Sequence, residues 1–185
     1  FYEYDNLQYQ ATDPELYQGG VGNVPESEIY GAEIELGAFL TDSLVFDARI
    51  ALLETEITAS HLALDNVAGE RRMNALLAQG FSKFGPEIQI ARAEEIADVE
   101  GNDLPKTPSF TANLALSYNK SIDGFGDIGG TLSYTHRGDF KHRMFNNPLT
   151  DDVNSYDTLD LVIKILPSDS NWRLELIAKN LTDED

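Results

Sequence analysis

The sequence predicts an all-β fold in which about seven antiparallel strands form part of the wall of a transmembrane β-barrel. Three observations support this prediction. Apolar and polar residues alternate along each run, which gives a strand one apolar and one polar face. The runs cover about the 9–11 residues that a tilted strand needs to cross a bilayer. Short turns also alternate with long loops along the chain, as they do in outer-membrane barrels.

The composition excludes several classes of protein. The 185 residues carry a formal net charge of -19, and they lack the clustered Lys and Arg that phosphate binding needs, so no nucleic-acid partner is expected. The chain has no cysteine, which excludes a disulfide framework, a thiolate metal site and a cysteine nucleophile. No apolar run approaches the length of a membrane helix, so a membrane role must use strands.

The N-terminal part of the chain contains one clear hairpin. Residues 1–10 are rich in aromatic side chains and predict a strand, whereas residues 11–27, with their glycines and prolines, predict a loop. Apolar and polar residues then alternate over residues 30–40 and 44–55, and a tight turn joins these two runs. We therefore expect an antiparallel hairpin here.

A long insertion, residues 56–106, follows this hairpin. Within it, residues 71–77 place Met73, Leu76 and Leu77 at helical spacing, which predicts a short helix. An acidic run lies between residues 94 and 103, and a solvated loop is its simplest interpretation. Connections this long are uncommon in compact domains and are usually functional.

Four further runs alternate in the same way, over residues 110–119, 128–137, 156–165 and 172–180. Short turns at residues 123–127 and 167–171 join them in pairs, and a loop over residues 138–155 separates the pairs. The chain thus contains about seven strands. The first and the last, residues 1–10 and 172–180, are expected to be open edges.

Aromatic residues lie near the ends of the predicted strands. Tyr118 and Trp172 flank short turns, and Tyr30 and Phe110 flank long loops, where aromatic girdles occur in membrane barrels. Two other interpretations remain open. One is a passive outer-membrane porin or similar barrel, and the other is a soluble β-sandwich of the carbohydrate-binding type.

Three segments resemble the TonB-dependent outer-membrane receptors. Residues 31–36 (GAEIEL) are similar to a G-x-E-x-E strand of that family. Residues 101–108 (GNDLPKTP) and the strand after them are similar to its G-x-x-L-P-x-x-P segment. Residues 156–161 with Trp172 and the sequence NLTDE at 180–184 are similar to its last complete hairpin. Their order and spacing span nearly the whole chain.

The resemblance implies a fold and a function. Family members have a 22-stranded barrel with a plugged lumen, and residues 1–185 would be a C-terminal fragment of that barrel without the plug domain or the final strand. Such a receptor lies in the outer membrane of a Gram-negative bacterium, in contact with lipid and lipopolysaccharide. It takes up a scarce nutrient, such as a ferric siderophore, cobalamin, haem or an oligosaccharide, with energy from the TonB–ExbB–ExbD system. No enzymatic activity, cofactor or metal site is expected.

Cationic residues of the loops are the candidate ligand contacts. They are His136, Arg137, Lys141, His142 and Arg143 at one strand end and the following loop, and Arg71 and Arg72 in the insertion. Arginine offers paired donors to carboxylates, so these side chains are predicted to bind an anionic ligand. The alternative is that they neutralise nearby acidic loops or lipopolysaccharide phosphates. The spacing of His136, Asp139 and His142 fits no standard metal site.

Charged residues on the polar faces of the strands are predicted to face the barrel lumen. They are Glu33, Glu35, Asp47, Arg49, Lys164, Arg173 and Lys179. We expect them to pair across strands or to contact the plug. No nucleophile or base accompanies them, so they do not form a catalytic site.

Overall fold

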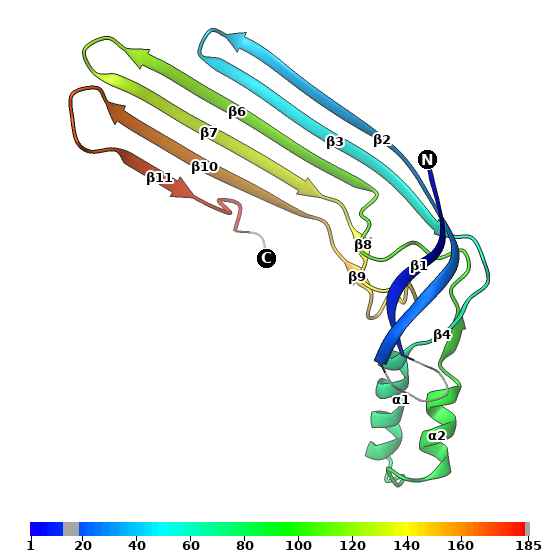
Figure 1. The fold of residues 1–185 in the computed structure, drawn as a ribbon. Coiled ribbons are helices and arrows are strands. Elements are labelled where there is room, and N and C mark those ends of the chain that lie inside the picture. Colours follow the sequence, from blue (N-terminus) through cyan, green and yellow to red (C-terminus); the bar gives the residue numbers. More distant parts are fainter. Residues whose placement is uncertain (13–18, 184–185) are drawn as a thin grey trace. The chain divides into compact units, whose positions relative to one another are not determined.

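The computed structural model describes residues 1–12 and 19–183 of the chain (Figure 1). The chain forms two compact units. The loop unit comprises Phe1–Tyr30, Glu54–Thr107 and Lys141–Asp152, and the strand unit comprises Gly31–Leu53, Pro108–Phe140 and Val153–Asp185.

Seven strands form one sheet in which each strand pairs with its neighbours along the chain, in the order β1-β2-β3-β6-β7-β10-β11. Their bounds are β1 Tyr2–Thr12, β2 Gly19–Thr41, β3 Leu44–Ile57, β6 Phe110–Ile122, β7 Gly126–Arg137, β10 Tyr156–Pro167 and β11 Leu174–Ala178. The predicted number of strands and the two predicted edges, β1 and β11, are confirmed. Short turns join β2 to β3, β6 to β7 and β10 to β11, which confirms the three short turns predicted from the sequence.

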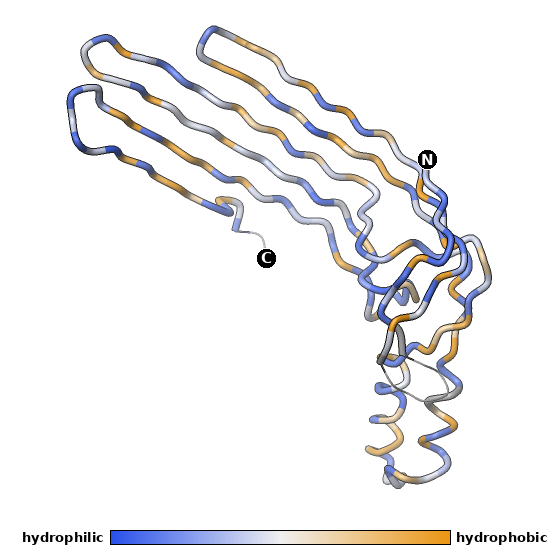
Figure 2. The backbone as a smooth tube through the Cα atoms, viewed as in Figure 1, coloured by the Kyte–Doolittle hydropathy of each residue, from blue (hydrophilic) through white to orange (hydrophobic). Residues whose placement is uncertain are grey.

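The register of the strand unit places apolar residues on one face of the sheet. Leu132 of β7 lies opposite Leu116 of β6 and Leu161 of β10. The adjacent Ser133 lies opposite Ala115 and Asp160, on the other face. Figure 2 shows the resulting alternation of hydrophobic and hydrophilic residues along each strand.

The apolar face of the strand unit is exposed. Leu36 and Leu176 each keep 54% of their surface accessible, and Leu132 keeps 39%. Exposed apolar surface of this extent marks an interaction site in soluble proteins, and it is the expected outer surface of a membrane barrel. In a β-sandwich this face would be packed against a second sheet, so the exposure disfavours the sandwich interpretation.

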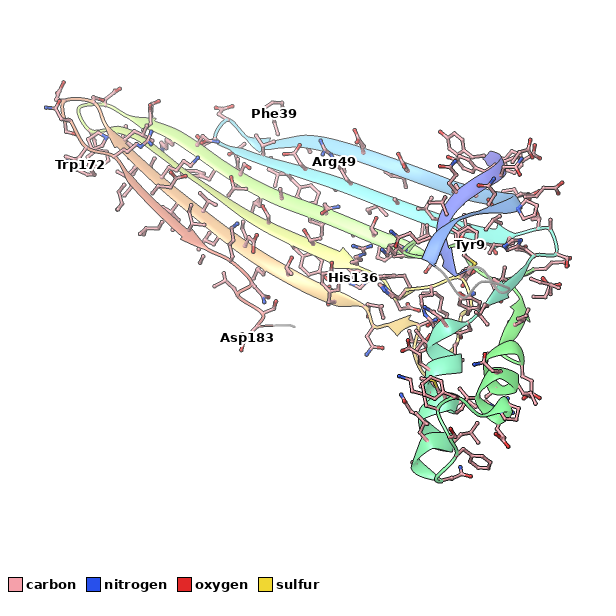
Figure 3. All side chains as sticks on the ribbon, turned by 60° about the horizontal axis from the view of Figure 1, so that its bottom comes forward. Tyr9, Phe39, Arg49, His136, Trp172 and Asp183 are labelled. Atoms are coloured by element: carbon pink, nitrogen blue, oxygen red, sulfur yellow. The ribbon has the colours of Figure 1, made fainter. Side chains whose placement is uncertain are left out.

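Aromatic residues lie at the turn ends of the strands. Trp172, 56% exposed, lies between the end of β10 and the start of β11, and Tyr118 of β6 lies opposite Leu44 at the start of β3. Figure 3 labels Trp172 together with Phe39, which lies near the turn end of β2. Along β2, Phe39 lies on the same side of the sheet as Glu35 and Gly37, because every second residue of a strand shares one face. Phe39 is therefore an apolar residue on the polar face.

The loop unit contains a small hydrophobic core. Its buried members are Val24, Ile57, Ala63, Val99, Leu104 and Met144, and Leu7, Tyr9, Ile29 and Phe145 pack against them. These residues come from β1, β2, β3, β4 (Leu62–Leu64) and the loop segments around Val99, Leu104 and Met144. The core therefore joins parts of the chain that are far apart in sequence.

The long insertion is more ordered than the sequence predicted. The helix expected near residues 71–77 is confirmed as α1, Asn66–Ala78. A second helix, α2 (Pro86–Ala93), and a ladder between β4 and β5 (Ile96–Asp98) were not predicted. The two helices form a hairpin (Figure 1). The loop expected over residues 138–155 likewise contains β8 (Phe140–Lys141) and β9 (Asp152–Val153).

The predicted loop over residues 11–27 is wrong for residues 11–12, which belong to β1, and for residues 19–27, which belong to β2 and pair with β1. Residues 13–18 lie outside the described residues. One of the glycines that suggested a loop, Gly22, lies opposite Tyr9, and the ring of Tyr9 covers the space that a side chain at this position would fill. Such cross-strand cover offsets the low strand propensity of glycine.

Among the described residues, no helix is long and apolar enough to cross a membrane.

Introducing a charged side chain on the apolar face tests whether this face contacts lipid. We expect Leu132→Arg to lower the free energy of unfolding of the complete protein in a phospholipid bilayer by about 2–4 kcal/mol, because the charge must be buried in hydrocarbon. Ser133→Arg adds the same side chain on the other face and serves as the control. Chemical denaturation of both variants in liposomes measures the difference. Equal destabilisation by the two substitutions would contradict the assignment of the faces.

Candidate ligand-binding site

The loop unit contains an open cavity with a volume of about 990 Å³. Volumes of this size are typical of sites for small molecules. The lining comes from β1, the start of β2, β4, the start of α1 and two loop segments, and comprises Tyr9, Gln10, Gly20, Val21, Ala63, Leu64, Asn66, Pro105, Lys106, His142, Arg143, Met144 and Phe145. The cavity is therefore built by tertiary packing and not by one continuous motif.

The cavity lining differs in charge from the rest of the chain. The whole sequence contains 32 acidic residues against 13 Lys and Arg. Among the lining residues that the structure describes, however, Lys106, His142 and Arg143 are basic and none is acidic. Apolar and aromatic side chains, including Tyr9 and Phe145, make up most of the remainder. A cavity of this character suits an anionic molecule that also has an apolar part.

Arg143 lies at the centre of a buried ionic cluster. Its Nε donates to Asp151 Oδ1 at 2.8 Å, its Nη1 donates to Asp65 Oδ1 at 2.5 Å, and its Nη2 donates to Thr150 Oγ1 at 2.9 Å. The side chains of Asp65 and Asp151 are 7% and 0% exposed. Burial alone would lower the pKa of Arg143, but the hydrogen bonds and charges of the two aspartates outweigh burial and raise this pKa.

The same cluster organises the surrounding backbone. Asp65 is the N-cap of α1 and accepts hydrogen bonds from the backbone N–H groups of Val67 and Ala68, both at 3.1 Å. Asp151 accepts the N–H of Asn147 at 3.0 Å through its side chain. Arg143 therefore ties the loop segment 141–152 to the start of α1, and this segment supplies Met144 and Phe145 to the cavity wall.

Lys106 occupies an unusual backbone position at the edge of the cavity. Its φ angle is +62°, in the left-handed region that residues other than glycine rarely adopt. The surrounding hydrogen bonds hold this conformation. Lys106 N–H donates to Lys141 O at 2.7 Å, and the hydroxyl of the adjacent Thr107 donates to Leu104 O. The Lys106 side chain is exposed, and it forms no ion pair with any residue that the structure describes.

Tyr9 forms an aromatic part of the cavity wall and is labelled in Figure 3. The phenol oxygen lies 2.6 Å from His61 Nε2, and the two rings meet edge to face with centroids 5.7 Å apart. Burial raises the pKa of Tyr9, so the phenol is neutral at physiological pH. The His61 contact holds the ring of Tyr9 in its place in the cavity wall.

The other predicted cations of the loop unit lie outside the cavity lining. Arg72 forms ion pairs with Glu94 and Glu95 of the acidic run, and Lys141 Nζ lies 2.5 Å from Asp152 Oδ1. Arg71 is exposed on α1. Of the predicted contacts in this unit, only His142 and Arg143 line the cavity.

His136 and Arg137 belong to the strand unit. His136 Nδ1 lies 2.7 Å from Asp157 Oδ1, and Tyr134 OH donates to the same oxygen at 2.5 Å. His136 shares the alternation of Tyr134 and Leu132, so it lies on the apolar face, at the end of β7 (Figure 3). The guanidinium of Arg137 lies over the ring of Phe140, 4.5 Å from its centroid, a cation–π contact.

The charged residues of the polar face are partly paired across strands. Arg49 Nε lies 3.6 Å from Glu35 Oε1, and Lys164 Nζ lies 3.2 Å from Glu175 Oε1. The remaining predicted members are exposed, namely Glu33, Asp47, Arg173 and Lys179. The structure thus provides two of the expected cross-strand pairs, and the orientation of this face toward a lumen stays a prediction.

Sequence reasoning missed Tyr9, Lys106 and Phe145 as cavity residues. Lys106 lies in the L-P-x-x-P segment, which was used only for the resemblance, and Tyr9 lies in a strand whose facing was ambiguous. The charge contrast between the lining and the whole chain becomes visible only when the cavity is assembled.

Comparisons with known proteins agree with this architecture. A family model described as "TonB dependent receptor-like, beta-barrel" matches residues 1–181. Among solved structures, the chain is similar to the siderophore receptor PiuA from Acinetobacter baumannii, with 20% sequence identity and a TM-score of 0.56. That alignment covers 98% of this chain and 21% of the receptor chain, so the chain spans about a fifth of its length. A search of curated protein sequences finds no match.

Asp151 belongs to the buried cluster and the adjacent Asp152 does not, so we expect substitutions of these two residues to differ in their effect on stability. We expect Asp151→Asn to destabilise the loop segment 141–152 by about 1.5–3 kcal/mol, because it removes charged hydrogen bonds from Arg143 while Asp65 remains. Asp152→Asn breaks an exposed pair with Lys141 and should cost at most about 1 kcal/mol. Hydrogen exchange of the amides in this segment measures both effects. Equal exchange rates in the two variants would contradict the role assigned to the cluster.

Proposed function

Because the chain belongs to the TonB-dependent receptor β-barrel family, we propose that the complete protein is an outer-membrane receptor that takes up a scarce nutrient with energy from TonB. The family is one of receptors and transporters and not a class of enzymes. Residues 1–185 are then a C-terminal part of the barrel, and the family's plug domain and final strand lie elsewhere in the complete protein. The observation that carries the proposal is the family match over residues 1–181.

The proposed location is the outer membrane of a Gram-negative bacterium. The exposed apolar face of the strand unit supports this location, because it suits contact with lipid and lipopolysaccharide acyl chains. The charged residues of the opposite face, such as Arg49 and Lys164, would then face the lumen and the plug. The TonB–ExbB–ExbD system would act through that plug.

The proposed ligand is a ferric siderophore. Two observations support this choice, and the first of them disfavours a neutral oligosaccharide. The described lining of the cavity is basic in an acidic chain, and many ferric siderophore complexes are anions with aromatic or apolar parts. The structurally similar protein from Acinetobacter baumannii is a siderophore receptor. Of the contacts predicted from the sequence, His142 is exposed in the cavity lining. The side chains of Arg72, His136, Arg137, Lys141 and Arg143 already pair with or stack on neighbouring residues.

Growth and uptake in a deletion strain test the proposal. We expect deletion of the full-length gene to reduce growth under iron limitation and to abolish uptake of one radiolabelled ferric siderophore. Deletion of TonB should abolish the same uptake, because transport through a plugged barrel needs energy. A panel of glycans as sole carbon source provides the parallel test for an oligosaccharide ligand. Uptake that requires the receptor but continues without TonB would contradict the proposal and indicate a passive barrel.

A further inference from the structure

We propose that Lys106 selects an anionic ligand in the cavity with help from His142, whereas Arg143 positions the cavity wall and does not contact the ligand. This inference rests on the proposed function, because it assigns specificity to the same site. It differs from the expectation drawn from the sequence, in which Arg143 was a contact and Lys106 was not considered.

Arg143 has almost no capacity left for a ligand. A guanidinium has five N–H donors. Nε bonds to Asp151, Nη1 bonds to Asp65, and Nη2 lies near both Thr150 Oγ1 and Asp151 Oδ1, 2.9 and 2.6 Å away. Its side chain is only 19% exposed. The two carboxylates already neutralise the positive charge of Arg143, so its guanidinium contributes little attraction to an anionic ligand.

Lys106 and His142 are the basic lining residues whose side chains are exposed. Neither forms an ion pair with a described residue, so no carboxylate that the structure describes neutralises the charge of Lys106. The backbone of His142 is held by a hydrogen bond from its N–H to Asp151 O at 2.6 Å. Asp151 therefore positions the backbone of His142, whose side chain is exposed in the cavity lining.

The backbone of Lys106 supports a role for its side chain. A left-handed conformation is strained for lysine and unstrained for glycine. The same segment does place a glycine, Gly101, at a positive φ of 79°. Residues kept in strained conformations are concentrated at binding and catalytic sites, where the surrounding structure enforces them. Here the hydrogen bond from Lys106 N–H to Lys141 O enforces the conformation and directs the chain past the cavity.

The rest of the lining defines the ligand class. Tyr9, Val21, Leu64, Met144 and Phe145 provide apolar or aromatic surface. A ligand that uses both parts of the cavity is an anion with aromatic or aliphatic groups, and a ferric tris-catecholate complex meets this description. A neutral ferric trihydroxamate of similar size gains nothing from the ammonium group of Lys106.

Binding to the purified full-length receptor tests the role of Lys106. The probes are a ferric tris-catecholate and ferric citrate, which are anionic, and a neutral ferric trihydroxamate. The variant Lys106→Asn removes the charge and keeps the backbone, because asparagine tolerates the left-handed conformation. We expect it to weaken binding of the anionic probes about fivefold, which corresponds to about 1 kcal/mol for one exposed charge contact. Binding of the neutral probe should stay unchanged, and Lys106→Arg should restore anion binding.

The matched control is Lys83→Asn, which makes the same charge change on the exposed loop between α1 and α2, outside the cavity lining. It should leave all affinities unchanged. Loss of anion binding in Lys83→Asn equal to that in Lys106→Asn would indicate a general charge effect and overturn the proposal. Unchanged anion binding in Lys106→Asn, or no binding of either anionic probe to the wild-type receptor, would also overturn it.

The dependence of binding affinity on salt concentration distinguishes the ligand contact proposed for Lys106 from the positioning role proposed for Arg143. Salt screens the attraction between Lys106 and an anion, so Lys106→Asn should reduce the salt dependence. Arg143→Lys keeps the charge but loses the planar fork that joins Asp65 and Asp151. We expect Arg143→Lys to weaken the binding of anionic and neutral probes equally and to leave the salt dependence of binding unchanged. Selective loss of anion binding in Arg143→Lys would overturn the division of roles. These measurements do not involve TonB, so their failure is distinct from a failure of TonB-dependent uptake.

Discussion

Backbone pairing between consecutive strands is the constraint on which the rest of the strand unit depends. A bilayer interior offers no water to an unpaired N–H or C=O group, so each spanning strand must satisfy its backbone through its neighbours. From β3 to β10 the register continues without interruption, for example from Ala48 to Leu114 and on to Tyr134 and Leu159. Because side chains alternate along paired strands, this register places most of the large apolar residues of these strands on one face.

The loop unit depends on a different interaction, the cluster of Arg143 with Asp65 and Asp151. Taking charges out of water is costly, and such clusters add little stability in general. This cluster nevertheless satisfies several groups at once, because Asp65 caps α1 and Asp151 binds the backbone of its own loop. A chain with a formal charge of -19 thereby keeps two aspartates away from the cavity surface, and the basic character of the lining follows.

The sequence predicted the strand unit well, because a period of two with short turns is a local signal. It also located α1 from the spacing of Met73 and Leu77. It failed for residues 19–27, where the glycines suggested a loop and the covering ring of Tyr9 could not be foreseen. The candidate site was predicted only in part. Arg143 was predicted as a ligand contact. Its partner Asp65 lies 78 residues away in the sequence and is recognised only in the folded chain.

In outer-membrane barrels the short turns lie on the periplasmic side and the long loops on the extracellular side, and the proposed location extends this rule to the short turns and the long insertion of this chain. Residues 1–185 contain no cysteine, so Lys83→Cys and Asp169→Cys each introduce a single thiol into this part of the receptor. In intact cells a membrane-impermeant maleimide should label Lys83→Cys, between α1 and α2, and should label Asp169→Cys, between β10 and β11, only after permeabilisation. Labelling of Asp169→Cys in intact cells, or protection of Lys83→Cys, would contradict the account.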